Sequence, residues 1–278
     1  MIPELRPRSV GEVLDAAVLL YRARFGALMR VTIAVVVPVS LLTMLVLLSA
    51  LPDESVGVTE ISPVFGNTGD DAAQLGAIVV TTILTALSTA FVTAAVTRIV
   101  ADAYVGRTAQ PGEAARDAGH RFLPIVGVTL VTTIGVTIGF VLCIVPGLWL
   151  QVAWCIAIPV LMLERTKVIP ALGRSFALTK TRFWLAFGVY WLSQLLVITL
   201  STGLAAGLGW VIQSSDSDTA DVIAQSVGNA VATIVTLPFA AAALVALYFD
   251  LRIRNEAFDV QMMIAGLDET RAADALPA

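Results

Sequence analysis

The sequence predicts an all-α fold: a polytopic membrane helical bundle with six transmembrane helices as three hairpins, each preceded by a cytoplasmic amphipathic helix. Three observations support this prediction. Of 278 residues, 58% are hydrophobic and 14% are charged, whereas soluble domains have about a quarter charged residues. Six long apolar stretches have no charged residue at their centres. The basic residues also fall on one side of a six-span arrangement.

Each apolar stretch is long enough, or nearly so, to cross a bilayer, which takes about 20 mostly apolar helical residues. The fourth is the shortest, and Pro146 and Gly147 indicate a tight turn before it. We expect the third and fourth spans to form one hairpin that enters near Phe122 and leaves at Glu164. The expected spans cover residues 27–51, 73–102, 122–145, 147–164, 184–212 and 223–249.

The distribution of charge predicts the orientation. All 17 Lys and Arg residues lie in the N-terminal segment, in 98–121, in 165–182 or in the C-terminal segment. The loops on the opposite side, 52–72 and 213–222, contain no basic residue. Their acidic residues are Asp53, Glu54, Glu60, Asp70, Asp71, Asp216, Asp218 and Asp221. Because basic loops stay cytoplasmic during insertion, we expect both termini in the cytoplasm.

The segments that precede spans 1 and 5 resemble each other. Leu14, Leu20, Arg24, Phe25 and Val31 match Leu172, Leu178, Arg182, Phe183 and Val189, and Arg22 matches Lys180. A weaker third copy precedes span 3, where Gly112, Glu113, Arg121 and Phe122 correspond to Gly11, Glu12, Arg24 and Phe25. The sequence therefore predicts three units in the same orientation, which is a parallel repeat.

These units divide a single integral membrane domain that covers residues 1–278. The expected parts are an amphipathic helix in 1–26, a hairpin in 27–102, a second helix with its hairpin in 103–164, a third in 165–249, and a cytoplasmic tail in 250–278 whose end we expect to be disordered. Ser9 and Glu12 form a capping box at the start of the first helix. Such helices lie in the membrane interface or pack under the bundle, and the sequence leaves both arrangements open.

The sequence offers little for catalysis or for cofactor binding. His120 is the single histidine, and Cys143 and Cys155 lie in apolar runs without metal or redox spacing. No glycine-rich phosphate loop is present, and a net charge of −4 gives no basic field for nucleic acid. Because the span centres lack ionisable groups, the sequence also argues against proton-coupled transport. We expect no catalytic residue, no metal, no cofactor and no nucleic-acid partner.

Small residues and prolines mark the spans. The pairs Gly135 with Gly139 and Gly203 with Gly207 are spaced four apart, which favours close helix packing. Prolines lie within spans 1, 4 and 6, where they kink helices or line cavities. The second span is rich in hydroxyl groups, from Thr81, Thr82, Thr85, Ser88 and Thr89. Prolines and hydroxyls together favour an alternative function, a transporter or channel for a neutral or amphiphilic solute.

The most suggestive polar feature is residues 165–182, which we call the basic segment. It contains no acidic residue, and its bases are Arg165, Lys167, Arg174, Lys180 and Arg182. Bases at the cytoplasmic face attract anionic lipid headgroups, by about 1 kcal/mol each. The alternative is that they only determine topology.

Ion pairs are also expected where each hairpin ends. The expected pairs are Asp102 with Arg98 and Arg107, Glu164 with Arg165, and Asp250 with Arg252 and Arg254.

Four stretches resemble a known family: RPRSVGEVLDAAVLLYRARF at 6–25, IVPGLWLQVAW at 144–154, ERTKVIPALGRSFALTKTRFW at 164–184 and YFDLRIRNEAFD at 248–259. They are similar to the membrane-domain family of glycerophosphoryl diester phosphodiesterases and related uncharacterised actinobacterial integral membrane proteins. In fused members the reaction belongs to a separate barrel, and nothing here resembles it. The resemblance therefore implies a stand-alone membrane module without catalytic residues.

The interpretation is then a non-enzymatic scaffold or accessory protein of a bacterial cytoplasmic membrane. We expect it to bind anionic headgroups on the cytoplasmic side or a membrane-protein partner.

Overall fold

The computed structural model describes residues 9–49, 71–104, 110–212 and 218–256, and the regular structure in these ranges is helical. Within these ranges, six segments are long and apolar enough to cross a membrane. This confirms the all-α class and makes the chain a multi-pass membrane protein. The helices are α1 (Val10–Ala23), α2 (Phe25–Ser49), α3 (Asp71–Tyr104), α4 (Pro111–His120), α5 (Phe122–Leu142), α6 (Ile144–Ala153), α7 (Ala157–Leu163), α8 (Val168–Lys180), α9 (Phe183–Ile212) and α10 (Asp218–Glu256).

Several expectations fall outside the described residues. They concern the C-terminal tail from residue 257, whose end we expect to be disordered, and most of the two acidic loops. Asp71, Asp218 and Asp221, expected in those loops, instead belong to α3 and α10. Both helices continue beyond the apolar stretches because hydropathy marks only the part of a helix that lipid can cover.

The short helices α1, α4 and α8 end just before the long helices that begin at Phe25, Phe122 and Phe183. The sequence repeat therefore marks three real helix boundaries. The capping box of α1 is confirmed, because Glu12 N donates to Ser9 Oγ at 3.4 Å and Ser9 N donates to Glu12 Oε2 at 2.7 Å. Helix α4 has 10 residues, whereas α1 has 14. The copy of the repeat before span 3 therefore matches the first copy at both ends, but the two matching ends lie closer together in the sequence.

The connection between the third and fourth spans differs from the expected one. Cys143, with extended backbone at φ −173° and ψ 154°, separates α5 from α6 and is exposed. Pro146 and Gly147 instead lie in the first turn of α6. Proline is tolerated there because the first N–H groups of a helix have no partner within it. The expected turn at Pro146 and Gly147 was therefore wrong.

The fourth span is interrupted, whereas one helix was expected. Helix α6 ends at Ala153 and α7 begins at Ala157. Pro159 follows the interruption, and its missing N–H removes the hydrogen bond that would reach back to the carbonyl of Cys155 within it. Pro38 and Pro238, in contrast, lie inside the continuous helices α2 and α10.

Helix α10 contains the longest candidate span, with 33 residues from Ile223 to Asn255. At 1.5 Å per residue this stretch measures about 50 Å, against about 30 Å for a bilayer core. The helix must therefore tilt, bend or extend beyond the bilayer. The helix itself continues past residue 249, the expected end of the span, through charged residues to Glu256.

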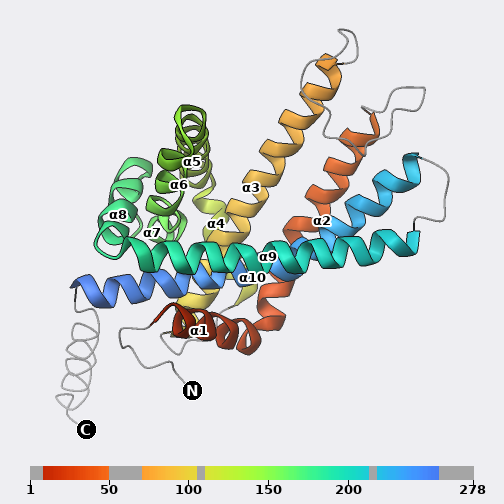
Figure 1. Cartoon of the computed structure of the whole chain (residues 1–278). Helices are drawn as coiled ribbons and strands as arrows, with labels where there is room; N and C mark the ends of the chain where they lie inside the picture. Colours follow the sequence, from red (N-terminus) through yellow and green to blue (C-terminus); the bar gives the residue numbers. More distant parts are fainter. Residues whose placement is uncertain (1–8, 50–70, 105–109, 213–217, 257–278) are drawn as a thin grey trace.

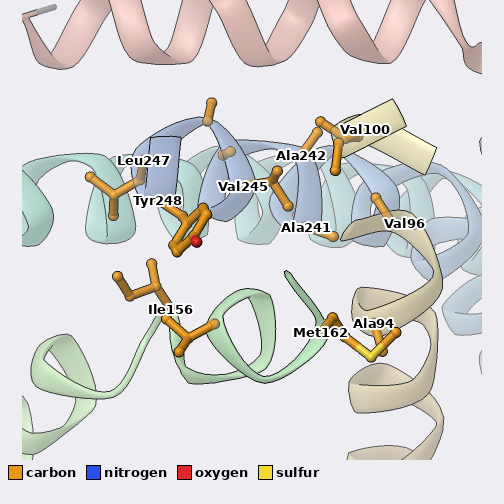
Figure 2. Packing of buried hydrophobic residues seen from close by; sticks show 14 of the residues in the cluster. Ala94, Val96, Val100, Ile156, Met162, Ala241, Ala242, Val245, Leu247 and Tyr248 are labelled. Atoms are coloured by element: carbon orange, nitrogen blue, oxygen red, sulfur yellow. The ribbon is translucent and has the colours of Figure 1, made fainter. Parts of the chain in front are cut away.

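The buried core gathers at one end of the molecule. We call it the short-helix end: it consists of α1, α4, α7, α8 and the last turns of α3 and α10. Figure 2 shows its packing around Val96, Val100, Ile156, Met162, Ala241 and Val245. Away from this end the helices diverge, and Figure 1 shows the far ends of α5 and α6 well separated from that of α3. Leu41, Val79 and Ile138 there are more than half exposed, as suits side chains that face lipid.

The contacts between helices follow a cyclic order. Helix α4 packs on α2 and α3, α8 packs on α5, α6 and α7, and α1 packs on α9 and α10. The long helices follow the same cyclic order: α5 packs on α3, α9 packs on α6, and α2 packs on α10. Helices α3, α7 and α10 pack on one another inside this ring. The sequence repeat predicts three consecutive units in the same orientation, and such units would give this pattern of contacts if they stood in a ring.

Two of the ring contacts use equivalent residues. Val10 of α1 and Val168 of α8 are equivalent in the sequence repeat, as are Gly188 of α9 and Gly127 of α5. A Cβ atom at Gly188 would lie 3.1 Å from Cγ2 of Val10, and one at Gly127 would lie 2.7 Å from Cγ2 of Val168. Glycine thus allows the close approach at both places. The third equivalent position is Arg30, which is exposed.

Tyr21 fastens α1 to the middle of α10. Its Oη donates to the carbonyl oxygen of Val235 at 3.0 Å, and its ring packs edge-on against Phe239 with centroids 6.3 Å apart. Burial raises the pKa of Tyr21, so the phenol stays protonated and can donate. One face of α1 thus packs on the bundle. Leu19, also on α1, is 64% exposed, so its side chain is free to contact lipid.

Candidate functional site

The five bases of the basic segment occupy two different environments. Arg165 and Lys167 lie in the connection before α8, Lys180 ends α8, and Arg182 precedes α9; these four residues are exposed. Arg174 lies within α8 and is partly buried. The structure therefore leaves four bases at the surface and gives the fifth a protein partner.

That partner is Glu164, at the end of α7. Arg174 Nε lies 3.1 Å from both carboxylate oxygens of Glu164. Tyr248 Oη donates to Glu164 Oε1 at 3.1 Å, and Arg252 Nη1 donates to Tyr248 Oη at 3.1 Å. We call these four side chains the Glu164 cluster. It joins α7, α8 and α10 at the short-helix end.

The expected pair of Glu164 with Arg165 was wrong. Glu164 caps the C-terminus of α7, and Arg165 follows with φ 52°, in the left-handed region that usually takes glycine after a helix. The chain reverses there, and α8 packs back on α7. This reversal brings Arg174 to Glu164 instead of the neighbour in sequence.

The other two expected ion pairs are confirmed in part. Arg98 Nε lies 3.5 Å from Asp102 Oδ2, and Arg254 Nε lies 2.7 Å from Asp250 Oδ2. Arg107 lies outside the described residues. Asp250 is only 3% exposed, and buried charged groups are normally paired.

Helix α8 is also fastened to the interruption in the fourth span. Ala157 N bonds the carbonyl of Trp154 at 3.0 Å, so it is not the partner of the Ala153 carbonyl. Ser175 Oγ and Thr179 Oγ1 donate to the Ala153 oxygen at 2.8 Å and 3.2 Å. Both side chains are buried. Helix α8 thus supplies hydrogen bonds that the interrupted backbone lacks.

Removing both hydroxyls should destabilise the protein. The double variant Ser175→Ala, Thr179→Val is expected to lose about 2 kcal/mol, because it leaves a buried carbonyl unpaired. A thermal shift in detergent micelles measures the loss. The matched control is Thr199→Val with Thr202→Val, whose exposed hydroxyls bond only their own helix. An equal shift in the control would contradict a special role for the Ala153 contact.

A shallow groove of about 560 Å³ opens beside the basic segment, between the starts of α5 and α8. Leu123 and Pro124 form one wall, and residues 166–170 form the other. The lining is apolar apart from Thr166 and Lys167. Leu123 is 80% exposed and Ile169 is 69% exposed, so the groove continues the apolar surface of the spans.

Other candidate chemistry gains no support from the arrangement. His120 lies at the exposed end of α4. Among the residues that the structure describes, no three His, Cys, Asp or Glu side chains group as metal ligands. The absence of a catalytic centre stays a prediction.

The sequence did not predict the roles of three residues, Tyr248, Ser175 and Thr179. For the two hydroxyl residues a signal existed, since positions four apart share one face of a helix. No comparable signal identifies Tyr248, whose partner Glu164 lies far away in the sequence.

Comparison of the chain with protein families, with curated proteins and with solved structures gives no match. The resemblance described from the sequence therefore rests on the four quoted stretches alone.

Proposed function

We propose that the chain is a non-enzymatic module of a bacterial cytoplasmic membrane that binds anionic lipid headgroups through its basic segment. The short-helix end then faces the cytoplasm, with both termini on that side. The chain would be a relative of the membrane-domain family that the four stretches resemble. A membrane-protein partner on the same surface is the alternative outcome of the tests.

The observation that carries the proposal is the exposure of four bases beside exposed apolar side chains. Arg165, Lys167, Lys180 and Arg182 are exposed, and Trp184 just after them is 79% exposed. Tryptophan at the start of a span is typical of the membrane–water boundary. Bases at this depth can meet phosphate groups while the neighbouring apolar residues meet acyl chains.

The test compares lipid retention by the natural chain and by a variant in which Gln replaces Arg165, Lys167, Lys180 and Arg182. Arg174 stays, because it belongs to the Glu164 cluster. Native mass spectrometry of protein released from nanodiscs of mixed phosphatidylglycerol and phosphatidylcholine measures the lipid that stays bound. At about 1 kcal/mol per base, the variant is expected to lose its preference for phosphatidylglycerol.

The control variant exchanges Arg and Lys at the same four positions and keeps the charge. It should retain phosphatidylglycerol, because the attraction depends on charge more than on shape. An unchanged lipid preference in the Gln variant would overturn the proposal. Loss of a co-purifying membrane protein without loss of lipid would favour the partner instead.

A second candidate, a path for a neutral or amphiphilic solute, is favoured by the interrupted fourth span, since interrupted spans line substrate sites in many transporters. Two observations weigh against it. The interruption is filled, because Ile156 is fully buried and Ser175 occupies the Ala153 carbonyl. Thr81 and Thr85 of the second span donate to carbonyls of their own helix. Uptake of small polyols into proteoliposomes would revive this candidate.

A further inference from the structure

We propose that one anionic phospholipid occupies the groove between the starts of α5 and α8, with its headgroup at Arg165 and Lys167. This inference rests on the proposed function and deepens it, because it assigns the lipid to a defined place rather than to the basic segment as a whole. Lys180 and Arg182, at the other end of α8, would then contribute little.

The groove has the chemistry of an acyl-chain site. Its walls are formed by Leu123 and Pro124 on one side and by Val168, Ile169 and Pro170 on the other. A peptide segment would bring backbone N–H and C=O groups that these walls do not pair. A free phosphate ion would gain nothing from them. A lipid acyl chain needs no hydrogen bonds, and its burial is favourable.

Positive charge lies at the groove. Lys167 lines it and Arg165 lies two residues before, and both are exposed. Lys167 is also the N-cap of α8, and no side chain caps this N-terminus. The first N–H groups of a helix and its dipole favour an anion. A phosphate there would meet two bases and an uncapped helix start.

A buried polar atom in the groove lacks a partner. Thr166 Oγ1 is buried and has no hydrogen-bond partner among the described residues. Buried hydroxyl groups are normally paired. Thr166 itself lines the groove, and rotation of its side chain toward the groove would let the hydroxyl donate to an oxygen atom of a lipid headgroup or glycerol ester.

The backbone conformation of Arg165 also supports a lipid site at the groove. Its φ of 52° makes it the residue other than glycine with positive φ in the described part of the chain. Glycine is the usual choice after a helix because it adopts this conformation without strain. An arginine here forgoes that stability, and such positions cluster at functional sites. The side chain is therefore a reasonable candidate for function.

The test uses two charge-matched double variants in the full chain. Arg165→Gly with Lys167→Gln removes the bases at the groove, and Lys180→Gln with Arg182→Gln removes two bases away from it. The first is expected to weaken phosphatidylglycerol binding about 30-fold, from the contribution of each base and the conversion of free energy to affinity. The second should change it less than about threefold. Titration by native mass spectrometry in phosphatidylcholine nanodiscs measures both.

Two further measurements distinguish loss of lipid binding at the groove from loss of protein stability. Melting temperature should stay equal or rise in the Arg165→Gly variant, because glycine relieves the backbone at this position. Ile169→Trp, at an exposed position, fills the groove without changing charge and should also weaken binding. A loss of binding together with a loss of melting temperature in every groove variant would overturn the assignment.

The outcomes separate this inference from the proposed function. Equal losses in the two double variants, or a loss only in Lys180→Gln with Arg182→Gln, would overturn the groove and leave the basic segment as the binding surface. No loss in either double variant, together with no loss in the fourfold Gln variant, would overturn both.

Discussion

Replacing Gly139 with leucine is expected to cause a large loss of stability, about 3 kcal/mol and roughly 10 °C in melting temperature. A Cβ atom at this position would lie 2.9 Å from Cα and 3.0 Å from N of Gly147. Both neighbours are backbone atoms, so no side chain can rotate away. Helices α5 and α6 would have to move apart. This movement would disturb the interrupted span and the surface on which α8 packs. Thermal unfolding in detergent micelles measures the loss.

The same substitution at Gly203 or Gly207 is the matched control. Both glycines belong to α9, are spaced like Gly135 and Gly139, and have no described atom within 4 Å of an added Cβ. Leucine there is expected to change the melting temperature little. A loss as large as that of Gly139→Leu would contradict the open surface of α9 and would indicate a second molecule packed on it.

Replacing Glu164 with alanine is expected to cost about 2 kcal/mol, because Arg174 and Tyr248 would lose their shared acceptor. The estimate lies below that for a fully buried pair, since the Glu164 side chain is 18% exposed and that of Arg174 is 31% exposed. Glu164→Gln should lose about half as much, because an amide oxygen still accepts from Tyr248. Thermal unfolding of both variants, with Arg174→Gln for a double-mutant cycle, measures the coupling.

Asp102→Ala serves as the comparison. The Asp102 pair with Arg98 is longer at 3.5 Å, has similar exposure and joins residues of one helix. Its loss should cost less than about 1 kcal/mol. The Glu164 cluster differs in that it joins three helices. If the two alanine variants lose the same stability, the cluster does not hold α8 on the bundle.

Hydropathy was sufficient to predict the six spans, because a helix that faces lipid must be apolar along its length. The repeat predicted the helix boundaries before Phe25 and Phe183, since a local sequence pattern sets a local break. Spacing alone was a poorer guide to packing. Gly139 packs closely on Gly147, but Gly203 meets nothing described, because the same pattern packs only where another helix arrives.

Contacts between distant residues were the part that the sequence could not supply. Arg174 lies ten residues from Glu164, and its approach depends on the reversal at Arg165. Tyr248 is 84 residues away from the same carboxylate. The Ala153 carbonyl at the interruption accepts hydrogen bonds from hydroxyls of α8, and the sequence near Ala153 does not reveal these donors. The exposure of the four remaining bases depends on how α8 packs on the bundle, which the sequence does not reveal.

The cyclic packing has a consequence for synthesis of the protein. Helix α1 leaves the ribosome well before the helices on which it packs, because Val10 packs on Gly188 and Tyr21 bonds Val235. At 5–20 residues per second, α1 waits roughly 10–40 s for these partners. An amphipathic helix without a partner is expected to rest on the membrane surface during that time. Only after α9 and α10 have been made can α1 pack on them, and chains truncated before α9 should leave α1 open to proteases.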